Sequence, residues 1–62
     1  MKVNKMKFES NVNYLFVMCD GEENSQGKVV NQKGNSIELD NGDIINGLYV
    51  DHIVVLGEQI TN

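Results

Sequence analysis

The 62-residue sequence predicts one small, mostly-β domain, in which five short strands form a barrel or a meander sheet with little or no helix. Three observations lead to this prediction. Eight Val and five Ile residues dominate the apolar set, and these β-branched side chains favour strands. Ala, a strong helix former, is absent. Apolar and polar residues alternate in several segments, and turn dipeptides such as Asn-Gly separate these segments.

The chain is expected to divide into three parts. Residues 10–57 form the single domain, residues 1–9 form an N-terminal edge segment, and residues 58–62 form a frayed tail. In the edge segment, Met6 and Phe8 alternate with charged residues. This alternation indicates a short edge strand whose lysines face water.

Residues 12–19 fit two structures. Val12, Leu15, Phe16 and Cys19 have helical spacing. However, the run has no polar face, and it consists largely of β-branched and aromatic residues. We therefore predict a strand here, with a helix as the alternative.

The strongest local signal is a hairpin. Ser36-Ile37-Glu38-Leu39-Asp40 alternates with a period of two and is followed by Asn41-Gly42, then Asp43-Ile44-Ile45. Asn-Gly tolerates positive φ at both central positions of a type I′ turn. Upstream, residues 26–31 read as another strand that joins the hairpin through a loop at residues 32–35. These three strands form a meander.

The last strand is interrupted. Two apolar pieces, Leu48-Tyr49-Val50 and Ile53-Val54-Val55-Leu56, flank the polar pair Asp51-His52. The interruption indicates a β-bulge or a single 3-10 turn. Asn46-Gly47 offers another turn before both pieces, and the sequence alone does not choose between these layouts.

This order of elements resembles an SH3-like small β-barrel. Gln26-Gly27-Lys28-Val29-Val30, followed by Ile37-Glu38-Leu39 and a turn glycine, is similar to the KOW-type variant. The segment from Asp51 to Leu56 resembles the closing turn and strand of such barrels. The resemblance implies a contact surface between three segments of the chain: residues 20–25, residues 32–35 and residues 49–52.

The charge distribution argues against nucleic acid as a partner. The net charge is −4, and no Arg is present to read phosphates or guanine edges. The loop at residues 20–25 is acidic where nucleic-acid-binding KOW domains are basic. One alternative is an acidic mimic of nucleic acid that occupies a basic groove. The other is a nucleic-acid-associated barrel that uses Lys2, Lys5, Lys7, Lys28, Lys33 and Tyr49.

The sequence contains no residue pattern that is typical of a catalytic site or a metal site. Cys19 and His52 are the only thiol and imidazole, and the local signatures of cysteine enzymes are absent. The oxygen-rich residues 20–25 lack the spacing of a Ca²⁺ loop, so neither a metal nor a cofactor is expected. A single Cys and a polar first ten residues predict a cytoplasmic location, and no apolar run approaches the length of a membrane span.

The most informative feature for function is a surplus of apolar side chains. Only alternate residues of a strand face a core, yet residues 14–19 and 53–56 are apolar on both faces. The surplus must be covered by residues 3–9, by a second copy, or by a protein partner.

We therefore predict a non-catalytic domain that binds another protein or itself, in the manner of a phage- or mobile-element-type regulator or inhibitor. The candidate interface residues are Tyr14, Phe16, Met18 and Val54. The candidate partner-binding residues are Asp20, Glu22, Glu23, Lys33, Tyr49 and His52.

Overall fold

The computed structural model describes residues 3–58, which form one five-stranded antiparallel sheet. Two short 3-10 helices complete the fold. The strand order is β4-β3-β2-β1-β5, so the first four strands form a meander and β5 returns to pair with β1. The mostly-β prediction is confirmed, and the sheet is not closed into a barrel, because β4 and β5 remain its edges. The elements are η1 (Val3–Lys5), β1 (Val12–Met18), β2 (Ser25–Lys33), β3 (Ser36–Leu39), β4 (Ile44–Asn46), η2 (Gly47–Tyr49) and β5 (Val50–Glu58).

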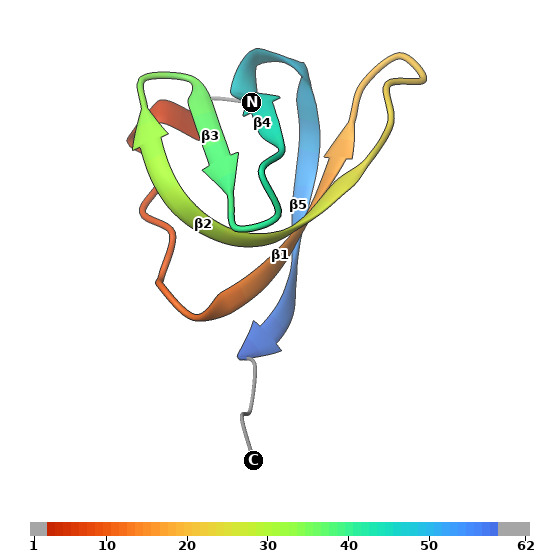
Figure 1. The fold of residues 1–62 in the computed structure, drawn as a ribbon. Helices are drawn as coiled ribbons and strands as arrows, with labels where there is room; N and C mark the ends of the chain where they lie inside the picture. The colour runs from red at the N-terminus through yellow and green to blue at the C-terminus, as the bar shows by residue number, and fades with distance from the viewer. Residues whose placement is uncertain (1–2, 59–62) are drawn as a thin grey trace.

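The sheet curls around one hydrophobic core (Figure 1). Along β1, Val12, Tyr14 and Phe16 are buried, whereas Leu15 and Val17 are half-buried on the opposite face. This alternation shows that β1 is the predicted strand and not the alternative helix. The buried hydrophobic residues are Val3, Val12, Tyr14, Phe16, Ile37, Leu39, Ile45 and Val50.

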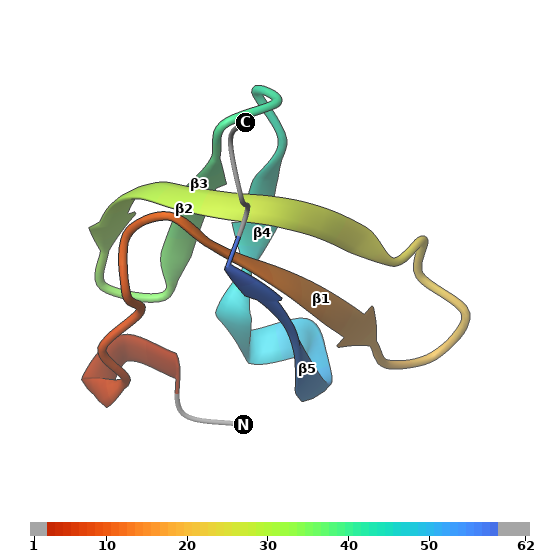
Figure 2. The same ribbon diagram turned by 90° about the horizontal axis from the view of Figure 1, so that it is seen from below.

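The N-terminal helix η1 closes the core where the sheet is open. Val3 is completely buried, and the side-chain amide of Gln32 donates a hydrogen bond to the Val3 carbonyl at 2.8 Å. Figure 2 shows η1 near η2. The two helices are so close that a Cβ atom on Gly47 would overlap the Val3 side chain. Gly47 is therefore required by packing.

Residues 6–9 continue over the core as coil, so the edge strand predicted around Met6 and Phe8 does not form. The Phe8 ring packs against Tyr14 and Phe16, with centroid distances of 5.2 and 5.7 Å. The Glu9 N–H donates to the Tyr14 hydroxyl at 2.9 Å. Side-chain packing and a side-chain acceptor thus hold this segment in place of a strand ladder.

The predicted hairpin forms between β3 and β4, but its turn is not the predicted type I′ turn. The Gly42 N–H donates to the Leu39 carbonyl at 3.0 Å, and the Leu39 N–H donates to the Asp43 carbonyl at 2.8 Å. The φ angle is 91° at Gly42 but is not positive at Asn41. The connection is therefore a three-residue loop with a glycine bulge, the form that commonly follows a type I turn.

The interruption at Asp51-His52 is the predicted bulge, and the 3-10 turn lies earlier, at Asn46-Gly47, so Leu48 and Tyr49 belong to η2 and not to a strand. The Asn46 side chain accepts a hydrogen bond from the Leu48 N–H at 3.0 Å and begins η2. Within β5, Val50 and His52 each pair with a residue of β1, and Asp51 between them is the extra residue of a bulge. β5 ends at Glu58, one residue into the predicted tail, and residues 59–62 lie outside the described residues.

Replacing Gly42 with Val is expected to lower the free energy of unfolding by more than about 1 kcal/mol, because a β-branched residue resists positive φ. A Cβ at this position meets no atom within 4 Å, so backbone strain is the only cause. Gly42→Asn is the matched control, because Asn tolerates this conformation and should cost less. Urea denaturation measures both variants, and equal stabilities would contradict the observed turn.

Replacing Gly47 with Ala is expected to lower the free energy of unfolding by about 1–3 kcal/mol, through overpacking against Val3. Val3→Ala removes the opposing methyl groups. In the double variant, the loss should therefore be smaller than the sum of the two single losses. Simple additivity in chemical denaturation would show that the two helices do not touch.

Candidate contact surface

The helix η2 joins the two loops that the sequence places at a contact surface. At its start, the Gly47 N–H donates to the Asn35 carbonyl in the β2–β3 turn at 2.6 Å. At its end, the Tyr49 carbonyl accepts from the Cys19 N–H at 2.7 Å, at the start of the β1–β2 loop. All three segments consequently lie at one end of the sheet, at the top of Figure 1.

The acidic loop between β1 and β2 (residues 19–24) begins with a tight turn. The φ angles of Asp20 and Gly21 are 55° and 75°, and the Glu22 N–H donates to the Cys19 carbonyl at 3.1 Å. Two successive positive φ angles with this hydrogen bond define a type I′ turn. Asp-Gly at residues 20–21 therefore adopts the turn that the sequence analysis assigned to Asn-Gly at residues 41–42.

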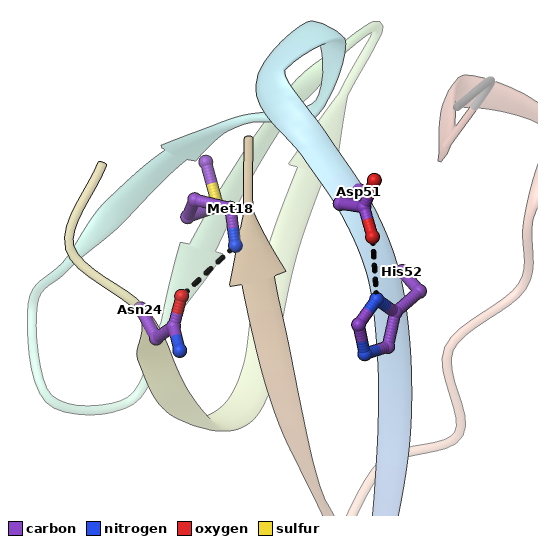
Figure 3. Close-up of polar contacts among 4 residues, drawn as sticks. All are labelled: Met18, Asn24, Asp51 and His52. Carbon is purple, nitrogen blue, oxygen red and sulfur yellow. Dashed lines mark hydrogen bonds and ion pairs between the residues drawn. The ribbon is translucent and has the colours of Figure 1, made fainter. Parts of the chain in front are cut away.

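A side chain ties the far end of the same loop back to the sheet. The Asn24 side-chain oxygen accepts a hydrogen bond from the Met18 N–H at 3.0 Å (Figure 3). The loop is thus fixed both by its first turn and by this link across its base. Its carboxylates project from a backbone with restricted freedom.

Two apolar side chains of η2 are exposed to solvent. Leu48 is 62% exposed and Tyr49 is 55% exposed, and the adjacent loop contributes three exposed carboxylates. We call this set the η2 surface, and it comprises Leu48, Tyr49, Asp20, Glu22 and Glu23. Four of the six predicted partner-binding residues belong to it.

The other two predicted partner-binding residues lie elsewhere. Lys33 ends β2 and lines a shallow hollow of about 200 Å³ together with Glu38 and Ile44. His52 lies in β5 opposite Val17, and its Nδ1 atom is 2.7 Å from Asp51 Oδ2 (Figure 3).

Two predicted interface residues are core residues. Tyr14 and Phe16 are buried because the even-numbered positions of β1 face inward, so they are removed from the candidate interface. Met18 is half-buried and packs against the same core. Val54 is 39% exposed and lies opposite Leu15, on the face of the sheet away from the core.

Several exposed apolar residues were not among the predicted site residues. Leu48, Val55 and Leu56 are all about half exposed or more. The Asn46-Gly47 dipeptide before Leu48 was the available signal, because a turn at that point lifts the next side chain off the sheet. No comparable signal marks the edge position of β5, which depends on the pairing of distant strands.

An open groove of about 500 Å³ runs between the N-terminal coil and the inner face of β1 and β5. It is mostly apolar, and its two charged residues are Lys7 and Glu9. Within residues 3–58, no three His, Cys, Asp or Glu side chains are grouped closely enough to hold a metal ion. The groove and the η2 surface therefore offer apolar contact and surface charge.

No family model, curated protein or solved structure matches this chain. None of the helices in the described part of the chain is long and apolar enough to cross a membrane.

Asn24→Ala is expected to loosen the β1–β2 loop, because the Met18 N–H loses its side-chain acceptor. Hydrogen exchange at the Met18 amide should become faster, while amides in the centre of β2 keep their protection. Asn31→Ala, at an exposed position of β2, is the matched control. An unchanged Met18 exchange rate in Asn24→Ala would contradict this anchoring of the loop.

Proposed function

We propose that this chain is a non-catalytic protein-binding domain whose partner docks on the η2 surface. The main support is a fixed backbone that carries exposed apolar side chains. η2 is capped by Asn46 and bonded to both neighbouring segments, yet Leu48 and Tyr49 are more than half exposed. A backbone that is already ordered loses little entropy on binding, which favours affinity.

The amount of exposed apolar surface also favours a binding role. Singly exposed apolar residues are normal, whereas neighbouring ones indicate an interaction site. Leu48 and Tyr49 are adjacent, and Val54, Val55 and Leu56 are exposed along β5, where successive side chains alternate between the two faces of the sheet. Within residues 3–9, Val3 is buried and Phe8 is half-buried in the core. This segment leaves both the η2 pair and the β5 residues exposed.

The charges of the η2 surface suggest the chemistry of the partner. The loop that carries Asp20, Glu22 and Glu23 begins at the hydrogen bond between Cys19 and Tyr49, so a partner that covers both elements needs an apolar pocket and a basic surface next to it. Rim charges of this kind accelerate association and lose their effect as salt rises. The partner is therefore a basic protein surface.

The alternative of nucleic-acid binding has less support from the arrangement of the lysines. Lys28 Nζ is engaged with the Asn11 side chain at 3.2 Å, and Lys33 shares its hollow with Glu38. Lys7 lines the groove together with Glu9. Lys2 lies outside the described residues. Carboxylates near two of these lysines weaken the attraction of a phosphate backbone.

The proposal also covers the fold resemblance, the class of protein and its location in the cell. The strand order, with a 3-10 turn before β5, supports a resemblance to SH3-like small barrels of the KOW type, although the sheet is open. The short, acidic, Arg-free composition suits a regulator or inhibitor of phage or mobile-element type. Such a protein acts in the cytoplasm by occluding or bridging its target.

Site-specific photo-crosslinking in source cells tests the η2 surface. A benzophenone amino acid at Leu48 is expected to give a discrete protein adduct, and excess wild-type chain but not Leu48→Asp should compete it away. Ile44 is the matched control position, because it is an apolar residue with 70% exposure on β4. Equal crosslinking from both positions would contradict the proposal. Adducts that nuclease destroys would instead favour the nucleic-acid alternative.

A further inference from the structure

We propose that β5 pairs with β5 of a second copy of this chain, antiparallel, about a twofold axis at Val54. This contact uses the edge of the sheet and not the η2 surface. The two proposals therefore fail independently of each other.

The edge position of β5 is the first observation. Within residues 3–58, β5 pairs with β1 on one side and has no strand on the other. An edge strand presents unpaired backbone N–H and C=O groups that can continue the ladder in another chain. β5 has nine residues, whereas the other edge strand, β4, has only three. Only β5 is long enough to support such a contact.

The exposed side chains along this edge are apolar. Val54, Val55 and Leu56 are 39%, 65% and 49% exposed, and no Asp, Glu, Lys or Arg lies between His52 and Gly57. Long edges in soluble proteins usually carry such charges, which discourage pairing. Bulges at Asp51 and Leu56 leave the stretch between them, residues 52–55, in regular pairing with β1.

A second copy of the chain is the expected partner of β5, because residues 52–55 can pair with the same residues of another copy. Residues that lie opposite each other in an antiparallel pair point to the same face of the sheet. In a symmetric pair of identical strands, one residue must therefore lie opposite its own copy, and the twofold axis passes between these two residues. An axis at Val54 places Val54 opposite itself and Ile53 opposite Val55 of the second copy. Apolar side chains then meet on both faces of the joined sheet.

Neighbouring registers are less favourable. An axis at Ile53 places Asp51 opposite Val55, and an axis at Val55 places the bulged Leu56 opposite Val54. Continuing the Val54 register brings Asp51 of the second copy opposite Gly57, so no carboxylate meets another within residues 51–57.

The size of the contact sets its strength. A pairing limited to one edge strand buries less than the about 1,200 Å² that stable complexes require, so a dissociation constant on the order of micromolar is expected. Each copy carries a net charge of −4, and physiological salt screens this repulsion beyond about 8 Å. The dimer should consequently weaken in low salt.

Sedimentation velocity at about 1–300 μM tests the inference. The wild type is expected to show a monomer–dimer equilibrium. Val54→Lys should raise its dissociation constant at least about tenfold, because two lysines then meet at the twofold axis. Ile44→Lys adds the same charge at an exposed position of the other edge, and it should change the dissociation constant by less than about threefold.

A cysteine pair tests the register. In a Cys19→Ser background, Val54→Cys should form an intermolecular disulfide under mild oxidation, because residues opposite in a strand pair lie within reach. Leu56→Cys should react more slowly, because it faces His52 of the second copy. Faster reaction of Leu56→Cys would overturn this register.

Two other results of these experiments would overturn the β5 pairing. A strict monomer at all concentrations overturns the inference and leaves the η2 proposal standing. A dimer that resists Val54→Lys but is lost in Leu48→Asp assigns self-association to the η2 surface and overturns the edge pairing.

Discussion

The packing of η1 against η2 is the contact on which the rest of this fold depends. A five-stranded sheet that does not close leaves one side of its core open, and Val3 fills that opening beside Gly47. Gln32 fixes the backbone at Val3, and Phe8 extends the cover across the aromatic residues of β1. In a chain this short, buried area is scarce, so an N-terminal segment that supplies one fully buried residue contributes substantially to folding.

The same contact determines what η2 can present to other molecules. Gly47 is the inward-facing residue of η2, because it packs against η1 and bonds to Asn35, and the next two residues face outward. Leu48 and Tyr49 therefore stand in solvent as a consequence of how the core is closed. The Cys19 N–H then joins the start of the acidic loop to the end of η2 through its bond to the Tyr49 carbonyl. Stability and the candidate contact surface thus have a common structural origin.

The sequence predicted the elements that depend on local patterns. β1, β2 and the β3–β4 hairpin lie where alternation and turn residues indicated. Features set by distant pairing were missed. The face of β1 that points inward depends on its register with β2 and β5, so Tyr14 and Phe16 were mistaken for interface residues. Asn41-Gly42 and Asp20-Gly21 offer similar turn chemistry, yet only Asp20-Gly21 has positive φ at both residues, so the dipeptide alone does not determine the turn type. The N-terminal coil is held by tertiary packing, which alternation does not reveal.

The proposed dimer and the proposed partner site are compatible in space. η2 ends where β5 begins, at Val50, whereas the twofold axis passes through Val54. An antiparallel pairing about this axis therefore directs the two η2 surfaces toward opposite ends of the joined strands. At about 3.3 Å per residue, their separation along the strand direction is roughly 30 Å. Neither copy then covers the other's η2 surface, and the dimer offers two equivalent sites. A weak dimer with two outward sites can engage a repeated or dimeric target with an affinity that neither site reaches alone, provided that the target's sites match this spacing.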